Sequence, residues 1–279
     1  MEKERIDLLV VQQGLTDSRE KAKRMVMAGQ VYDQNNLRYD KPGEKISIET
    51  QLHIKGETLK YVSRGGLKLE KALKVFNISV EGENVLDIGS STGGFTDVAL
   101  QNGAAHCYAL DVGTNQLDWK IRNNDKVTTM EQTNFRYTKL EDFKMGQPTF
   151  ACMDVSFISL KLILPALKNI LKEGGSAVSL IKPQFEAGKD KVGKKGIVSD
   201  PQVHEDVLDD ILHFANQNGF DVRHLDFSPI TGGTGNIEFL AHLVSTEAGA
   251  LGVTAEDIAI RSVIQEANEQ LKNKTITLH

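Results

Sequence analysis

Charged residues lie near the ends of two apolar runs of this sequence. Asp154 lies near the end of the run 150–156, and Lys182 ends the run 176–182. Two more charged residues belong with them, Lys68 in a helical stretch and Glu238 in another apolar run. A lone carboxylate near a core is costly, so Glu238 needs a partner. At a cleft edge such groups tune one another's pKa for proton handling, but two structural ion pairs, Lys–Glu and Lys–Asp, would satisfy the same pattern.

A glycine-rich turn follows another apolar run, 85–89. It consists of Gly89-Ser90-Ser91-Thr92-Gly93-Gly94 and leads into a helical pattern, so that backbone can approach a ligand closely. The dinucleotide fingerprint is incomplete because Ser91 replaces its second glycine, and no Gly-Lys-Ser/Thr of a P-loop follows. Asp111, 22 residues after Gly89, ends the next run, where a carboxylate can accept hydrogen bonds from both ribose hydroxyls. The turn and Asp111 together predict a ligand that contains a nucleoside.

The acidic residues favour S-adenosylmethionine as that ligand. Its ammonium and its ribose each need an oxygen acceptor, which Asp87 and Asp111 supply, and it carries no phosphate. Asp87 could instead cap the turn, and that alternative stays open. Asn134 follows the next strand-like run, and we expect its side chain at the adenine edge. The expected cofactor-binding residues are Asp87, Gly89, Ser90, Gly93, Gly94, Phe95, Thr96, Asp111, Asn134 and Asp154.

The elements that position these residues follow a repeated pattern. From residue 85 to residue 182, strand-like runs alternate with helical patterns, including helices expected over 114–122 and 159–172. Such repetition predicts an α/β fold with a mainly parallel sheet, helices on both faces, and ligands at the carboxyl ends of the strands. The runs 221–227 and 237–244 have no helix between them, so they should pair antiparallel.

The first 60 residues differ from the rest. The net charge of the chain is −5, yet its first 65 residues carry a small positive excess. Helices are expected over 6–11 and 19–28, followed by short strands with turns at Asn35-Asn36 and Pro42-Gly43. We therefore expect one domain over residues 1–60 and a second over 61–279, with a linker at about 58–64.

The N-terminal stretch resembles the alpha-L RNA-binding domain. The matching residues are Arg5-Ile6-Asp7, Leu9, Gly14, Ser18-Arg19, Ala22 and Gly29-Gln30-Val31. The second helix would present Arg19 and Lys23 to phosphates, with Arg5 nearby, although a solvated charged face would look the same. Glu20 lies four residues before Arg24, which favours an internal ion pair for that arginine.

The larger domain resembles the FtsJ-like ribose 2′-O-methyltransferases, and the whole chain is similar to the TlyA, or hemolysin A, family of rRNA methyltransferases. The resemblance rests on four stretches: Ser63-Arg64-Gly65-Gly66-Leu67-Lys68-Leu69, Asp87 to Asp97, Asp154-Val155-Ser156-Phe157-Ile158-Ser159, and Leu180-Ile181-Lys182-Pro183-Gln184-Phe185-Glu186. It implies a Rossmann-like methyltransferase fold, a catalytic set of Lys68, Asp154, Lys182 and Glu238, and methylation of a cytidine 2′-hydroxyl in 23S rRNA, and in some members in 16S rRNA as well.

That chemistry accounts for the residue types. A ribose hydroxyl is a poor nucleophile, so the enzyme must position its oxygen and manage its proton. We expect Lys182 to contact that oxygen, as an ammonium that stabilises negative charge or as an amine that removes the proton. Asp154 would set the state of Lys182. Arg64 and the loop lysines Lys189 and Lys191 are expected to bind RNA, and the Gly/Lys-rich loop 187–196 to be mobile and close on it.

Other features exclude or weaken further classes of function. The charged N-terminus lacks a signal peptide, no window has the ~18 apolar residues of a membrane span, and a cytoplasmic protein is expected. Cys107 and Cys152 lie in apolar runs, as buried thiols in a reducing compartment would. The histidines lack the spacing of a metal site, so no metal is expected. Two alternatives stay open, a non-catalytic RNA-binding protein and a membrane-active protein acting through the amphipathic stretch 254–274, whose acidic face favours packing on the protein.

Overall fold

The computed structural model describes residues 2–27, 29–55 and 60–276. The chain divides into two compact units, residues 1–60 and 61–279. Each unit has its own apolar core, so the two are treated in turn. The expected linker at 58–64 lies partly outside the described residues.

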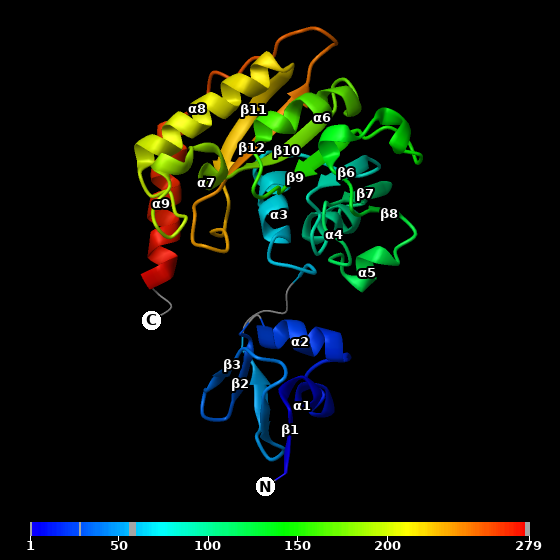
Figure 1. The fold of residues 1–279 in the computed structure, drawn as a ribbon, viewed down its shortest axis with the longest axis vertical. Coiled ribbons are helices and arrows are strands. Elements are labelled where there is room, and N and C mark those ends of the chain that lie inside the picture. The colour runs from blue at the N-terminus through cyan, green and yellow to red at the C-terminus, as the bar shows by residue number, and fades with distance from the viewer. Residues whose placement is uncertain (1, 28, 56–59, 277–279) are drawn as a thin grey trace. The chain divides into compact units, whose positions relative to one another are not determined.

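The first unit packs two helices against short antiparallel strands (Figure 1). Ile6, Leu9 and Val10 of the first helix and Val26 of the second are fully or almost fully buried between them. Both predicted helices are present. The elements are β1 (Lys3–Arg5), α1 (Ile6–Gln12), α2 (Arg19–Met27), β2 (Val31–Asp33), β3 (Arg38–Tyr39), β4 (Lys45–Ser47) and β5 (Leu52–Ile54). β1 pairs with β4, and β2 lies between β3 and β5.

The second unit is built on a seven-stranded sheet of order β11-β12-β10-β9-β6-β7-β8. Its strands are β6 (Asn84–Ile88), β7 (His106–Leu110), β8 (Val127–Met130), β9 (Phe150–Met153), β10 (Ser176–Ile181), β11 (Phe220–Phe227) and β12 (Phe239–Ser245). β8, β7, β6, β9 and β10 are parallel, while β12 runs antiparallel to β10 and to β11. The predicted Rossmann-like sheet and its antiparallel pair are confirmed.

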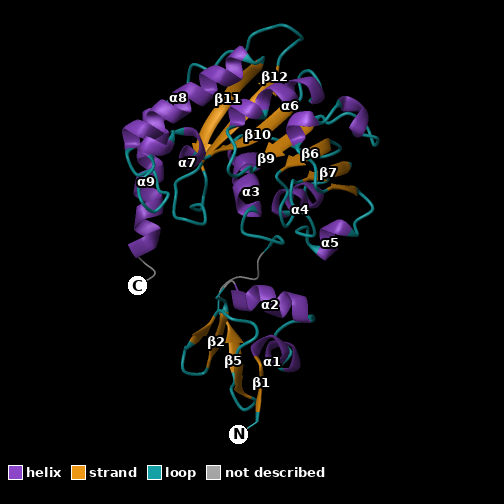
Figure 2. Cartoon of the chain, in the orientation of Figure 1, coloured by secondary structure: helices purple, strands orange, loops and turns teal. Residues whose placement is uncertain are grey.

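Helices cover both faces of this sheet (Figure 2). They are α3 (Gly66–Val75), α4 (Gly94–Gln101), α5 (Trp119–Arg122), α6 (Leu164–Ile170), α7 (Pro183–Glu186), α8 (Pro201–Gln217) and α9 (Ile260–Ile276). Short 3-10 turns lie at Phe135–Tyr137, Leu140–Asp142, Leu160–Leu162 and Lys189–Lys191. Side chains of α3 and α4 share one apolar cluster, and those of α6, α8 and α9 share the other. Parallel strands buried on both faces explain the continuous apolar runs of the sequence.

Two helix predictions were too long. The helix expected over 114–122 is only α5, because Asn115 adopts a left-handed conformation and Asp118 caps the new start by accepting the N–H of Lys120. The helix expected over 159–172 is a 3-10 turn followed by α6, whose first turn contains Pro165, a residue that has no N–H to donate within a longer helix.

The C-terminal amphipathic stretch packs on the protein. Ile264, Ala267 and Leu271 of α9 are buried in the cluster shared with α8 and β11. This placement confirms the packing prediction and removes the apolar face that a membrane-active helix would need. Within the described residues, no helix is long and apolar enough to cross a bilayer.

Candidate active site

The glycine-rich turn joins β6 to α4 and brings backbone close to the end of β9. A Cβ atom on Gly89 would lie 2.8 Å from the carbonyl oxygen of Asp154, so no larger residue fits without a shift. Gly93 has φ of +93°, in the left-handed region that glycine tolerates. These two positions explain why the turn is rich in glycine and why it can form the wall of a ligand cleft.

Asp87, in β6, is buried beneath this turn. Its Oδ2 accepts hydrogen bonds from the Thr96 backbone N–H (3.0 Å) and hydroxyl (2.7 Å). Its Oδ1 is buried without a hydrogen-bond partner among the described residues. Burial raises the pKa of Asp87 to about 7, against the opposing effect of the bonds from Thr96. The capping alternative thus accounts for one oxygen of this carboxylate and leaves the other available to a ligand.

Asp111 links the turn to the loop after β7. Its carboxylate accepts the N–H of Ser91 (2.8 Å) and the N–H of Gly113 (2.7 Å). Asn134, placed by sequence at the adenine edge, is exposed and caps the 3-10 turn at Phe135–Tyr137 by accepting the N–H of Arg136 (3.2 Å). Both residues lie at the carboxyl ends of neighbouring strands, and their contact with a cofactor stays a prediction.

A cleft of about 350 Å³ lies at the carboxyl ends of β6, β9 and β10. The glycine-rich turn forms one wall, and residues of four other segments complete the cleft. Its lining includes Ser63, Gly65, Lys68, Asp87, Gly89, Ser90, Gly94, Phe95, Asp154, Ser156, Lys182, Gln184, Phe185, Gly232, Thr234 and Glu238. Six of the ten predicted cofactor residues, Asp154 among them, therefore line this cleft, whereas Gly93, Thr96, Asp111 and Asn134 lie outside its described lining.

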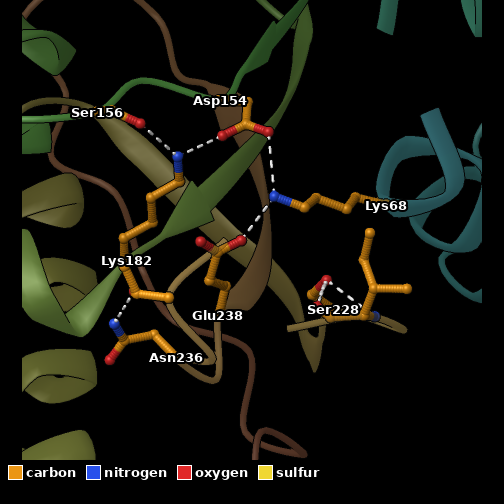
Figure 3. A network of polar contacts seen from close by, with 9 residues as sticks. Lys68, Asp154, Ser156, Lys182, Ser228, Asn236 and Glu238 are labelled. Carbon is orange, nitrogen blue, oxygen red and sulfur yellow. Dashed lines mark hydrogen bonds and ion pairs between the residues drawn. The ribbon is translucent and has the colours of Figure 1, made fainter. Parts of the chain in front are cut away.

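The four predicted catalytic residues form one connected chain of charges at this cleft (Figure 3). Lys182 Nζ lies 2.5 Å from one Asp154 oxygen, and Lys68 Nζ lies 3.2 Å from the other. Lys68 also contacts Glu238 at 2.6 Å. The alternative of two separate ion pairs does not describe this geometry, because Asp154 and Lys68 each contact two partners.

Burial and opposite charge compete in this network. Burial alone would raise the pKa of Asp154, but Lys68 and Lys182 outweigh it and hold that pKa below its ordinary value. Burial would lower the pKa of Lys68, but Asp154 and Glu238 outweigh it and raise that pKa. Asp154 is therefore a carboxylate and Lys68 an ammonium at neutral pH. Asp154 keeps 21% of its side chain exposed, so this end of the network faces the cleft.

Several cleft residues carried no predicted role. Ser156 accepts a hydrogen bond from Lys182 Nζ (3.0 Å). Gln184 has a buried Oε1 without a partner among the described residues. Thr234 belongs to a glycine-rich loop between β11 and β12. The run Thr231-Gly232-Gly233-Thr234-Gly235 was the sequence signal for that loop, since few other segments allow such close backbone approach.

The three predicted RNA-binding cations of the first unit have partners within the chain. Arg5 and Arg19 both contact buried Asp7 at 2.9 Å and hold its pKa below the ordinary value. Lys23 contacts Glu20 at 2.6 Å, whereas the spacing had favoured Arg24 as the partner of Glu20. Lys23 and, to a smaller extent, Arg24 hold the pKa of Glu20 below its ordinary value, so both cations interact with this carboxylate. A helix brings both i+3 and i+4 neighbours within reach, and the contact of Lys23 was the one that the prediction lacked.

The cations of the second unit lie beside the cleft. Arg64 is exposed between the cleft residues Ser63 and Gly65. Lys189 and Lys191 are exposed in the 3-10 turn after α7, and Lys191 contacts Asp206 of α8 at 3.0 Å. RNA contact by all six cations stays a prediction.

Comparisons with known proteins agree with this geometry. A family model described as FtsJ-like methyltransferase matches residues 61–244. The chain is 57% identical to the provisionally named rRNA methyltransferase YqxC of Bacillus subtilis, over 98% of this chain and 96% of that protein. It is 38% identical to the 16S/23S rRNA (cytidine-2′-O)-methyltransferase TlyA of Mycobacterium tuberculosis, over 94% and 97%. A solved Streptococcus thermophilus protein, provisionally named a hemolysin, superimposes with a TM-score of 0.79 at 57% identity, over 99% of each chain.

Proposed function

Since this chain belongs to the FtsJ-like methyltransferase family, we propose that it transfers a methyl group from S-adenosylmethionine to the 2′-oxygen of a cytidine in ribosomal RNA. The observation that carries the proposal is the connected chain of Lys182, Asp154, Lys68 and Glu238 at a cleft whose wall is a glycine-rich turn. The named activity of the M. tuberculosis relative supports cytidine in both ribosomal subunits as the substrate.

The cleft fits S-adenosylmethionine by its donor and acceptor chemistry. The buried free Oδ1 of Asp87 is an acceptor for an ammonium, and the absence of side chain at Gly89 leaves room for a ligand against the backbone. The cofactor supplies a methyl group activated by a sulfonium. We assign its binding to Asp87, Gly89, Ser90, Gly93, Gly94, Phe95, Thr96, Asp111, Asn134 and Asp154.

Lys182 is assigned to the attacking oxygen. Asp154 fixes its ammonium at 2.5 Å, and Ser156 accepts a second of its hydrogens, so the third can point to the 2′-oxygen. In that state Lys182 stabilises the negative charge that develops on the oxygen; in its amine form it would take the hydroxyl proton. Lys68 and Glu238 hold Asp154 from the opposite side.

RNA binding is assigned to cations of both units. Arg64, Lys189 and Lys191 lie beside the cleft, and Arg5, Arg19 and Lys23 belong to the first unit, which we propose to be an alpha-L type RNA-binding domain. Their partial pairing with acidic side chains lowers the positive potential but leaves the groups at the surface, where phosphates can compete for them.

Removing the carboxylate of Asp111 should weaken cofactor binding. Asp111→Ala deletes a ribose acceptor and the two bonds that join Ser91 to Gly113, so we expect affinity for S-adenosylmethionine to fall by roughly 10- to 100-fold, about 1–3 kcal/mol. Calorimetric titration measures this directly. Asp125→Ala, which removes an exposed carboxylate before β8, is the matched control and should leave affinity unchanged. Equal affinities for all three proteins would reject the assignment of Asp111.

Asp87 should make both stability and cofactor binding depend on pH. Because its folded pKa is about 7, against about 3.9 in an unfolded chain, the folded state keeps a proton that the unfolded chain releases. The free energy of unfolding therefore falls as pH rises from about 4 to about 7 and levels off above that.

A ligand ammonium favours the ionised form of Asp87, so cofactor affinity should rise from about pH 6 to about pH 8, and binding should release a proton. Denaturation and two-buffer calorimetry test this, and Asp87→Asn should flatten both curves; unchanged curves in that variant would contradict the account.

Methyl incorporation tests the proposed function. The protein is incubated with methyl-labelled S-adenosylmethionine and separated ribosomal subunits that lack the modification, and the RNA is digested to nucleosides. Label in 2′-O-methylcytidine is the expected result. Cofactor binding without any transfer to RNA would instead support the non-catalytic alternative. The membrane-active alternative is not favoured by any feature of the described residues, since the apolar side of α9 is buried.

A further inference from the structure

One buried amide ties together two loops on the cleft side of the sheet. Asn236, at the end of the loop 228–236, is 1% exposed. Its Oδ1 accepts the N–H of Val198 (2.9 Å), and its Nδ2 donates to the carbonyl of Gly196 (2.8 Å) and to the hydroxyl of Thr234 (2.9 Å). Both amide hydrogens and the acceptor oxygen are thus in use, so the side chain cannot turn without leaving buried polar groups unpaired. In Figure 3, Asn236 lies beside the network of Lys182 and Glu238.

The other loop that Asn236 holds is the Gly/Lys-rich loop 187–196, which it contacts at Gly196. This loop ends in a tight turn with two lysines, which we call the lysine turn (residues 193–197). Gly193 donates its N–H to Ile197 (3.0 Å), and Gly196 donates its N–H to Gly193 (2.8 Å). Lys194 and Lys195 lie at the tip and are exposed. Among the described residues, neither side chain has a hydrogen bond or an ion pair, in contrast to Lys191.

The base of the lysine turn is fixed from two sides. Asn236 holds Gly196 and the N–H of Val198, while His204 of α8 donates from Nε2 to the Val198 carbonyl (3.0 Å). Val198 and His204 are buried. Contrary to the expectation of a mobile loop, the part of it next to Val198 is anchored, so the two lysines are presented from a fixed base.

The same amide is connected to the cleft. Thr234, which bonds Asn236, lines the cleft, and Glu238 lies two residues further along and contacts Lys68 at 2.6 Å. A short path therefore connects the lysine turn to the charged network. It runs from Gly196 through the side chain of Asn236 and then along the backbone to Glu238.

We infer that the lysine turn is a docking point for the RNA backbone beside the target nucleotide, and that Asn236 is a positioning residue that fixes this docking point relative to the cleft. The inference rests on the proposed function. Two cations without acidic partners are suited to two phosphates, and a rigid base converts their binding into placement of the neighbouring ribose. Loss of the lysines should weaken RNA binding, whereas loss of the clamp should misplace RNA that is still bound.

A double-mutant cycle tests the inference. In the full-length protein, the pair Lys194→Ala and Lys195→Ala should raise KM for RNA at least about fivefold and reduce the slope of log KM against log salt by about 1.5, with unchanged cofactor affinity. Asn236→Asp keeps the acceptor for Val198 but loses both donated bonds, and kcat should fall about tenfold. In that background the lysine substitutions should still raise KM, because phosphate binding does not need the clamp. They should lower kcat no further, whereas in the wild-type background they lower kcat as well, because the docking point then still places the ribose. The pair Lys126→Ala and Lys172→Ala, exposed lysines at the opposite edge of the sheet, should change none of these values.

The outcomes separate the inference from the proposed function. Unchanged RNA affinity and salt slope in the lysine variant would overturn the docking point, and that binding measurement needs no catalysis. A further fall in kcat when the lysine substitutions are added to Asn236→Asp, as large as the fall that they cause alone, would overturn the role of Asn236. If Asn236→Asp does not fold, Thr234→Val, which removes only one link of the clamp, takes its place in the cycle and should lower kcat, with Thr234→Ser restoring it. A wild-type protein that binds RNA but transfers no methyl group would instead reject the proposed function.

Discussion

Lys182→Ala is expected to lower the rate of methyl transfer by at least ~10²-fold, the scale of losing a group that handles a proton or stabilises an oxyanion. Affinity for S-adenosylmethionine and for RNA should stay within a few-fold, because Lys182 is bound by Asp154 and Ser156 and is assigned to the reacting oxygen alone. Single-turnover kinetics with saturating RNA measures the chemical step, and equilibrium binding measures the two affinities.

Two further variants sharpen this result. Lys182→Arg should also be poor, because a guanidinium stays protonated and cannot occupy the compact position between Asp154 and Ser156. Lys161→Ala removes a surface lysine that contacts Asp210 at 2.7 Å and should retain full activity. If Lys182→Ala lost activity only in proportion to lost RNA affinity, Lys182 would be a phosphate contact and its catalytic assignment would be wrong.

Deleting residues 1–60 should abolish methylation of ribosomal RNA and leave cofactor binding intact. The cleft and its charged network lie wholly within residues 61–279, and the core of that unit includes no residue of the first 60. What the truncated chain loses is the proposed RNA-binding unit with Arg5, Arg19 and Lys23. Calorimetry with the cofactor and methyl transfer to ribosomal subunits measure the two properties separately.

A point substitution checks that RNA contact, and not a folding defect, explains the deletion. Arg5 and Arg19 are unsuitable, because removing either leaves buried Asp7 with one fewer partner. Lys23→Ala removes a cation whose only described contact is with exposed Glu20, so the unit should remain folded while the salt slope of RNA binding falls by about 1. Full activity of the truncated chain would reject a recognition role for the first unit.

The sequence was most informative where local pattern and topology coincide. Parallel strands expose their carboxyl ends at one edge of the sheet, so the runs that carry Asp154 and Lys182 were expected to end close together. In the structure, Lys182 Nζ lies 2.5 Å from a carboxylate oxygen of Asp154. The contact between Lys68 and Glu238 was harder to predict from the sequence. The two residues lie 170 positions apart, and the charge argument alone left a structural Lys–Glu pair open. The resemblance to a family added the prediction of one catalytic set, and the structure puts the two charged groups at 2.6 Å.

Other features depended on tertiary contacts that no periodicity encodes. The spacing predicted Arg24 as the partner of Glu20 and gave no sign that Lys23, on the same helix face, contacts it at 2.6 Å. The clamp of Asn236 joins residues about 40 positions apart, and a single asparagine between a glycine-rich loop and an apolar run gives no sign of its partners. The shortness of α5 follows from the left-handed Asn115 and from the cap at Asp118, and neither conformation could be read from the apolar pattern.

Mapping by alkaline hydrolysis tests most directly whether Lys182 and its network act in methyl transfer to a ribose oxygen. Alkali cleaves RNA through the free 2′-hydroxyl, so a 2′-O-methyl group protects the adjacent phosphodiester, whereas a methyl group on a base does not. Ribosomal RNA treated with the wild-type protein and S-adenosylmethionine should acquire a protected bond after a cytidine, and RNA treated with Lys182→Ala should not. Methyl incorporation without a protected bond, or equal protection by the two proteins, would contradict the account.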